Sequence, residues 1–262
     1  MHESLDALTL VLLALFGLAG GIGITAVGPG GVLPTIGMFL LTGLPPSTVA
    51  GTAIATHIAT GTLGTAAFAR SGQLKAGPTR HTVAVLAATA LVGTPVGVLL
   101  NTLVSGREFG ELLACAVTVT AVLVWLRDHR ERRAGAAVAP LSGEHIGTAP
   151  SVAVGLVVAV AAGLFGLGGP MLSVPLLVVC GLPVLTALAA AQAQSVVIAA
   201  IGTAGYALHG SVDWWLAAVV GVPELVGVLI GWRIAHAVPE RRLKYALVGA
   251  LLALAPYLAL HT

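Results

Sequence analysis

Charged side chains are scarce in this sequence. The 262 residues include 12 Lys and Arg and 10 Asp and Glu, or 8% of the chain, whereas soluble domains carry about 25%. So few charges cannot cover the surface of a water-soluble protein of this size. The net charge of +2 provides no basic surface for nucleic acid. The composition therefore excludes a soluble domain, a disordered chain and a basic nucleic-acid-binding protein.

Cysteine is equally scarce. The chain has only Cys115 and Cys180, and both lie in apolar stretches without metal-ligand spacing. Two isolated thiols exclude a secreted disulfide scaffold. We expect both to be packed thiols in the protein core.

Apolar residues are abundant instead. They make up 57% of the chain, with a mean hydropathy of +1.01, and they run in unbroken stretches without the alternation of an outer-membrane barrel. This pattern predicts an all-α polytopic membrane protein. The acidic residues 1–6 lack the basic start of a secretory signal peptide, so we expect the first stretch to be a retained membrane helix. The predicted segments are Leu5–Val27, Gly31–Leu44, Thr48–Ala69, Thr82–Leu100, Leu112–Leu126, Val152–Leu167, Met171–Leu182, Leu185–Leu208, Trp214–Ile234 and Leu243–Leu260.

Two of these segments are too short to span a bilayer. As helices, Gly31–Leu44 and Met171–Leu182 would rise only about 18–21 Å, against a hydrocarbon core of about 30 Å. Each follows a cluster of glycines. We therefore expect Gly/Pro-capped half-helices or re-entrant hairpins that meet near the midplane of the membrane.

The basic residues predict the orientation. Eleven of the 12 lie in three polar stretches that the segment count places on one face, and only Arg107 falls opposite. Because Lys and Arg are retained in the cytoplasm, this face is predicted to be cytoplasmic, with both termini outside the cytoplasmic membrane of a bacterium or archaeon. The eleven are Arg70, Lys75, Arg80, Arg127, Arg130, Arg132, Arg133, Arg233, Arg241, Arg242 and Lys244.

The two halves of the chain repeat. A shift of 138 residues aligns them without a gap, placing the Gly28 cluster on the Gly166 cluster and residues 43–45 on 181–183. With about five segments in each half, an odd number, the halves must enter the membrane from opposite sides. We predict two inverted-topology repeats, 1–126 and 151–262, joined by a basic cytoplasmic linker, 127–150.

The pattern G-x-G-G followed by G-L-P occurs at 28–31 with 43–45, and again at 166–169 with 181–183. Residues 209–214 read H-G-S-V-D-W, and residues 238–243 read V-P-E-R-R-L. In these motifs the chain resembles the TauE/SafE sulfite-exporter family. The resemblance implies a membrane protein that exports sulfite or organosulfonates, or takes up related small anions. The first half has Gln73, Leu74 and Lys75 where the family's G-x-V-D-W loop would stand, so the halves need not bind identically.

The glycine clusters are candidate substrate-binding sites. Glycine allows close backbone approach, and the N–H groups at the start of a following short helix favour an anion. Two such tips converging from opposite sides would hold an anion without a buried Lys or Arg. The alternative is that the glycines only allow close helix packing. The candidate residues are Gly28, Gly30, Gly31, Gly168 and Gly169.

Polar side chains on the third segment of each half are further candidates. Their hydroxyls and amides can donate hydrogen bonds to anion oxygens without adding charge. The alternative role is hydrogen bonding between helices. These residues are Thr52, Thr56 and His57 in the first half, and Gln192, Gln194 and Ser195 in the second.

His57 and Glu224 are the ionisable residues deepest in the predicted segments. Such residues are costly in a membrane and are candidates for function. Either could carry a proton, and His57 could also bind the anion directly. The alternative is a neutral, hydrogen-bonded structural role for each.

These observations predict a secondary transporter that moves a small anion by alternating access. The resemblance implies export, and transport would be coupled to protons if His57 or Glu224 carries one. A passive anion channel and a non-transporting membrane subunit of a partner enzyme are the alternatives. No catalytic set, metal cluster or cofactor motif is visible in the sequence, so we expect neither an enzyme nor a bound cofactor or metal. The expected partners are a small anion and the lipid bilayer, with a homodimer as a further possibility.

Overall fold

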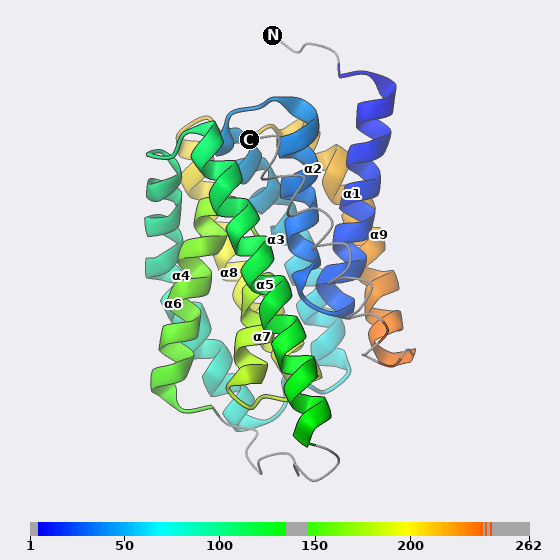
Figure 1. The fold of residues 1–262 in the computed structure, drawn as a ribbon, viewed down its shortest axis with the longest axis vertical. Helices are drawn as coiled ribbons and strands as arrows, with labels where there is room; N and C mark the ends of the chain where they lie inside the picture. The colour runs from blue at the N-terminus through cyan, green and yellow to red at the C-terminus, as the bar shows by residue number, and fades with distance from the viewer. Residues whose placement is uncertain (1–4, 135–145, 238, 240–241, 243–262) are drawn as a thin grey trace.

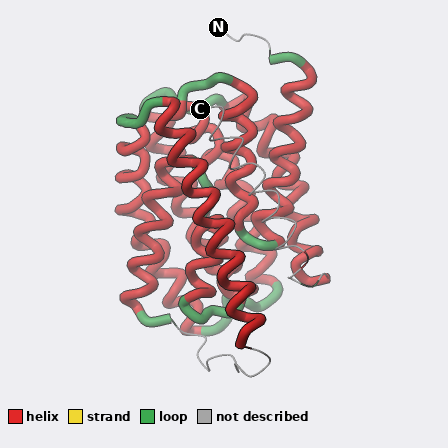
Figure 2. Tube along the Cα trace, viewed as in Figure 1, coloured by secondary structure: helices red, strands yellow, loops and turns green. Residues whose placement is uncertain are grey.

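The computed structural model describes residues 5–134, 146–237, 239 and 242 (Figure 1). Every regular element in these residues is helical, as the composition predicted (Figure 2). The tenth predicted segment, Leu243–Leu260, lies outside the described residues. The elements are α1 (Ala7–Ala26), η1 (Pro29–Val32), α2 (Leu33–Thr42), α3 (Pro46–Arg70), α4 (Gly77–Asn101), α5 (Gly106–Ala134), α6 (Thr148–Phe165), α7 (Pro170–Val179), α8 (Val184–Leu208) and α9 (Trp214–Ala237).

Five of the described helices, α1, α4, α6, α8 and α9, are long and apolar enough to cross a membrane. Large apolar side chains also cover outward-facing surfaces. On α4, for example, Leu91, Val92 and Leu99 are each more than half exposed. Exposed apolar surface of this kind is unfavourable in water and favourable against lipid tails. The helices therefore have apolar residues on both their inner and their outer faces.

That double-sided apolarity makes one prediction wrong. Cys115 and Cys180 are exposed and are not packed in the core. In a soluble protein an apolar stretch with a cysteine usually turns its thiol inward. In this chain the lipid-facing surface is as apolar as the interior, so the sequence pattern could not distinguish the two sides.

Helix α5 is longer than its apolar stretch. It begins at Gly106 and ends at Ala134, so it continues into the polar range predicted as a linker. At its start, the Ser105 backbone N–H donates a hydrogen bond to Glu108 Oε2 at 2.8 Å, and the Glu108 N–H donates to Ser105 Oγ at 3.3 Å. This reciprocal capping box starts the helix before the first apolar residue. The Arg- and Glu-rich end consists of good helix formers, so loss of hydropathy does not end the helix.

Short helices interrupt the bundle at both glycine clusters. In the first half, η1 and α2 follow Gly28, and in the second half α7 follows Gly169. Proline at the start of η1 and of α7 suits the first turn of a helix. Figure 2 shows the two connecting loops at intermediate height, away from the ends of the bundle where the other loops lie. The ten residues of α2 or α7 rise about 15 Å, about half the thickness of a bilayer core.

The backbone repeats with the same shift of 138 residues as the sequence. Helix α3, 46–70, maps onto 184–208, which are the bounds of α8. The described residues with positive φ are six glycines, and they form three pairs at this spacing. Glycine adopts this backbone conformation without the steric cost that other residues incur. The pairs are Gly28 with Gly166, Gly43 with Gly181, and Gly72 with Gly210.

The packing of the helices follows the repeat. Helices α3 and α8 pack against each other in the middle of the bundle, while α1 packs along α9 and α4 along α6. The shift carries α1 onto α6 and α4 onto α9, so it exchanges the two outer pairs. In Figure 1, α1 runs down from the amino terminus and α6 runs up from the lower end of the bundle. These two corresponding helices, α1 and α6, therefore run in opposite directions.

The contact between α1 and α9 depends on glycine. A Cβ built on Gly17 would lie 2.2 Å from the Val220 carbonyl oxygen, and one on Gly21 would lie 2.0 Å from that of Glu224. From the other side, a Cβ on Gly227 would lie 2.3 Å from the Leu18 carbonyl oxygen. These distances leave no room for a side chain. The two backbones touch through a small-xxx-small stripe, as is common between membrane helices.

We predict that Gly21→Ala lowers the free energy of unfolding by about 1–3 kcal/mol, because the methyl group would collide with the backbone of α9. Thermal unfolding of the purified protein in a mild detergent measures the effect. The control is Gly106→Ala, where an added Cβ meets nothing within 4 Å. Equal unfolding temperatures for the two variants would contradict the close packing of α1 on α9.

Candidate functional site

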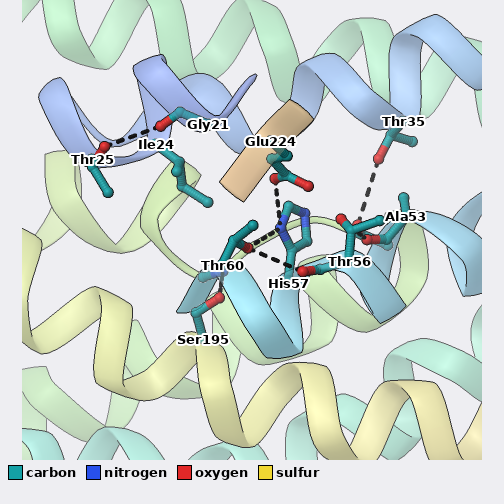
Figure 3. Close-up of polar contacts among 12 residues, drawn as sticks. Gly21, Ile24, Thr25, Thr35, Ala53, Thr56, His57, Thr60, Ser195 and Glu224 are labelled. Atoms are coloured by element: carbon teal, nitrogen blue, oxygen red, sulfur yellow. Dashed lines mark hydrogen bonds and ion pairs between the residues drawn. The ribbon is translucent and has the colours of Figure 1, made fainter. Parts of the chain in front are cut away.

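His57 and Glu224 meet in the interior of the bundle. His57 lies on α3 and Glu224 on α9, and Nδ1 of the imidazole is 3.2 Å from Oε1 of the carboxylate. Both side chains are fully buried. Figure 3 shows the two side chains pointing toward each other, with Thr60 beside the imidazole. The two residues that the sequence singled out separately thus form one contact.

Small residues bring α9 close enough for this contact. The Glu224 carbonyl oxygen lies against Gly21 of α1. Three residues earlier on α9, a Cβ on Gly221 would lie 3.3 Å from Cγ2 of Thr56 on α3. A larger residue at either glycine would push α9 outward. The position of the carboxylate is therefore set by two glycines on different helices.

Several polar atoms of this pair have no hydrogen-bond partner among the described residues. They are both carboxylate oxygens of Glu224 and Nε2 of His57. The hydroxyl of Thr60 is 3.5 Å from Nδ1 of His57, and it donates to the carbonyl oxygen of Thr56 at 3.2 Å. Unpaired polar groups are costly in an apolar interior. A buried ionisable pair with unpaired atoms is therefore a candidate for binding or proton transfer.

The two glycine clusters meet next to the imidazole. A Cβ on Gly31 would lie 3.4 Å from the backbone nitrogen of Gly168, so the two glycine-rich segments are in close contact. A Cβ on Gly168 would lie 3.4 Å from both Nδ1 and Cε1 of His57. The side chain of Ile24 closes the same space, with Cδ1 at 3.0 Å and 2.9 Å from these two added Cβ positions. One small region beside the imidazole is therefore lined by Gly31, Gly168, Ile24 and His57.

Helix α7 begins at this region. Its N-cap, Gly169, donates its backbone N–H to Oγ of Ser195 at 3.3 Å, and Pro170 is the first helical residue. Pro170 has no N–H, and the Met171 N–H donates to the Gly168 carbonyl oxygen at 3.3 Å, so the start of α7 offers mainly the partial positive charge of a helix start. Ser195 stands at the position equivalent to His57 after the shift of 138 residues. A hydroxyl and a helix start thus face the same region from the second half.

Some predicted site residues support the structure around this region. Gly28 lies against α7, since a Cβ on it would lie 2.8 Å from Cβ of Val174. Gly30 lies against the end of α1. Gln192 donates to the Ile24 carbonyl oxygen at 3.2 Å, and its own Oε1 is without a hydrogen-bond partner in the described part of the chain.

Three other predicted residues are engaged elsewhere. The hydroxyl of Thr52 accepts the backbone N–H of Asp213 at 2.9 Å, which ties α3 to the start of α9. Gln194 accepts from Ser173 Oγ at 2.5 Å and donates to the Gly155 carbonyl oxygen at 3.3 Å, joining α6, α7 and α8. Thr56 donates to the carbonyl oxygen of Ala53 in its own helix at 2.9 Å. These contacts fit the role of hydrogen bonding between or within helices.

Sequence reasoning missed several residues near the site. Ile24 is an ordinary apolar residue within an apolar segment, and no pattern marks it. The spacing of Gly17 and Gly21 is a small-xxx-small signal that could have indicated the α1–α9 contact. Tyr206 and Asn101 were also missed. They donate to the carbonyl oxygens of Gly163 and Leu164, both at 2.7 Å, and so cap the end of α6.

We predict that Gly168→Ala destabilises the protein and that Ile24→Val partly restores it. The methyl group added at residue 168 would press on Cδ1 of Ile24, which valine lacks. Thermal unfolding of both single variants and of the double variant gives their coupling free energy. Strictly additive effects would show that the two residues do not share the space beside His57.

Comparison with known families agrees with this architecture. The sequence profile described as "Sulfite exporter TauE/SafE" matches residues 13–258, which is nearly the whole chain. Comparison with curated proteins and comparison with solved structures found no significant match. The family is one of membrane transporters, which agrees with the apolar helices. The chain is a multi-pass membrane protein and belongs to the sulfite exporter TauE/SafE family.

Proposed function

We propose that this protein is a secondary transporter whose small anionic substrate binds where the two glycine clusters meet beside His57 and Glu224. The close approach of Gly31 and Gly168 at the start of α7 carries the proposal. A helix start, a hydroxyl at Ser195 and an imidazole are suitable partners for anion oxygens. No Lys or Arg lies within α1, α2, α6, α7 or α8. Sulfite and organosulfonates, with several oxygens around one sulfur, match this donor set.

Burial of the site supports alternating access. His57, Ser195 and Glu224 are fully buried, so a substrate in this conformation would be closed off from both sides. We infer that the two halves form an inverted-topology repeat, which the opposite courses of α1 and α6 support (Figure 1). In such repeats, one half rocks against the other and opens a midplane site to each side in turn. The boundaries 1–126, 127–150 and 151–262 remain our proposal for the two halves and the linker.

Transport by the purified protein distinguishes the alternatives. In liposomes preloaded with unlabelled sulfite, we expect labelled sulfite to accumulate transiently by counterflow, as in a carrier with a saturable site. Flux without counterflow would indicate a passive channel. An absence of flux with sulfite and organosulfonates would favour a subunit of a partner enzyme.

Ser195→Ala tests the location of the site. Losing one hydrogen bond to a charged group costs about 1.5–3 kcal/mol, so we predict a decrease of about tenfold or more in the kcat/KM of transport. The same substitution at Ser71, an exposed residue at the end of α3, serves as the control. If both variants transport as well as the parent protein, the substrate does not contact Ser195.

The positions of the basic residues support a cytoplasmic location for one end of the bundle. The α3–α4 connection and the ends of α5 and α9 all lie toward the lower end in Figure 1, and the start of α5 with Arg107 lies at the upper end. By the positive-inside rule, the lower end faces the cytoplasm. This orientation would place the amino terminus outside the cell.

Cysteine labelling tests the orientation. In a background with Cys115 and Cys180 replaced by serine, we predict that Ser71→Cys reacts with an impermeant maleimide only from the cytoplasmic side. Arg107→Cys is predicted to react only from the opposite side. Labelling of both positions from one side would refute the opposite placement of these two loops.

A further inference from the structure

We propose that the site takes up one proton with each singly charged anion, so that anion and proton cross the membrane together in the same direction. This inference rests on the proposed function and adds the coupling ion, its number and the sign of the coupling. The inference depends first on which charged groups lie around His57 and Glu224. It also depends on the hydrogen-bonding atoms that the pair leaves unused.

Among the residues that the structure describes, His57 and Glu224 are isolated from other ionisable groups. Helices α1, α2, α6 and α7 contain none, and α8 contains only Tyr206, whose hydroxyl donates to the Gly163 carbonyl oxygen. On the remaining packed helices, the ionisable residues lie toward the ends: Arg70 on α3, Arg80 and His81 on α4, and Arg233 and His236 on α9. Protonation of the site is therefore decided within the pair.

The pair has no net charge to offer an anion. Imidazolium with carboxylate, and imidazole with carboxylic acid, both sum to zero. An anion added to either form would leave one uncompensated negative charge in a fully buried apolar site, which is strongly unfavourable. One added proton gives imidazolium, carboxylic acid and anion, which again sum to zero.

The protonated pair also supplies the donors that an anion needs. Nε2 of His57 and both oxygens of Glu224 lack hydrogen-bond partners among the described residues. With the extra proton, the imidazolium can donate from Nε2 while its Nδ1 faces Oε1 of Glu224, and the carboxylic acid donates from one oxygen. Without the extra proton, the pair has one donor fewer: either the carboxylate can only accept hydrogen bonds and would repel the anion, or one nitrogen of the neutral imidazole can only accept. The same proton therefore balances the charge and creates a donor.

Helix dipoles do not replace the proton. The start of a helix carries about half a positive charge, but the end of a helix carries about half a negative charge. At each glycine cluster, the end of one helix lies next to the start of another: α1 ends at Ala26 just before η1, and α6 ends at Phe165 just before α7. The partial charges at each junction largely cancel. The helix starts can orient the anion, but they leave its net charge to be balanced by His57 and Glu224.

The repeat does not generate a second such pair. After the shift of 138 residues, the counterpart of His57 is Ser195, and that of Glu224 is Leu86, which is fully buried. Neither side chain titrates. The two halves therefore share one protonatable site, and the number of protons per anion is one. Because linkage is reciprocal, binding of an anion that requires the proton also raises the affinity of the site for the proton.

The test uses methanesulfonate, which stays a singly charged anion over the whole pH range, so that only the protein titrates. We predict that its Kd for the purified protein rises with pH, approaching about tenfold per pH unit where the empty site has lost the extra proton. The double variant His57→Gln/Glu224→Gln should bind more weakly, with a Kd independent of pH. The control Ser195→Ala should also bind more weakly but keep the pH dependence of the parent protein.

A flux measurement on the unmodified protein gives independent evidence. In liposomes with the membrane potential clamped at zero, an acidic exterior should drive uphill accumulation of labelled methanesulfonate. A membrane potential without a pH gradient should drive none, because the co-transport of one proton and one monoanion is electroneutral. This measurement does not depend on the folding of any variant.

The outcomes separate the two proposals. A pH-independent Kd of the parent protein, or a Kd that falls as pH rises, would overturn proton co-transport while leaving anion transport intact. Accumulation driven by the membrane potential alone would overturn it as well. If neither methanesulfonate nor sulfite binds or is transported, the proposed function fails and this inference fails with it.

Discussion

The architecture depends on the close approach of glycine-lined backbones inside an apolar bundle. Gly21 lets α9 lie against α1 with its Glu224 carbonyl oxygen where a side chain would otherwise stand. Gly31 and Gly168 let the two interrupted regions touch beside His57. Membrane helices gain little from apolar burial against one another, so close van der Waals contact between backbones holds them together. The same contacts bring an imidazole and a carboxylate within 3.2 Å.

The site combines features that oppose stability. A buried acid and a buried imidazole with three unpaired polar atoms cost folding free energy that apolar residues at the same positions would avoid. Elsewhere in the described interior, Tyr206 and Gln194 are hydrogen-bonded, whereas a few uncharged groups, such as the hydroxyls of Thr94 and Thr203, also lack partners. Local departures from a satisfied interior are typical of functional sites. The unpaired atoms that belong to ionisable side chains, those of His57 and Glu224, lie where we propose that the anion binds.

The repeat and its asymmetry explain different properties of the protein. Helices α3 and α8 have equivalent backbones, and the glycines with positive φ are equivalent as well, as the proposed exchange of packing roles between the two halves requires. The side chains at equivalent positions differ: His57 corresponds to Ser195, and Glu224 corresponds to Leu86. The site therefore has ionisable side chains at only one of the two equivalent sets of positions. The backbone symmetry is suited to movement between two states. The side-chain asymmetry is suited to a single protonation event.

Sequence alone was sufficient to predict the all-helical class, the two short helices and the spacing of the equivalent glycines, because hydropathy and backbone freedom are local properties. It also marked His57 and Glu224 as costly residues in apolar segments. Only the tertiary structure decided that these two lie together, that Thr52 is instead bonded to Asp213, and that Cys115 faces outward. The reason is physical: lipid and protein core are equally apolar, so hydropathy cannot reveal which face of a helix turns inward. The neighbours of a side chain follow from how closely the backbones pack.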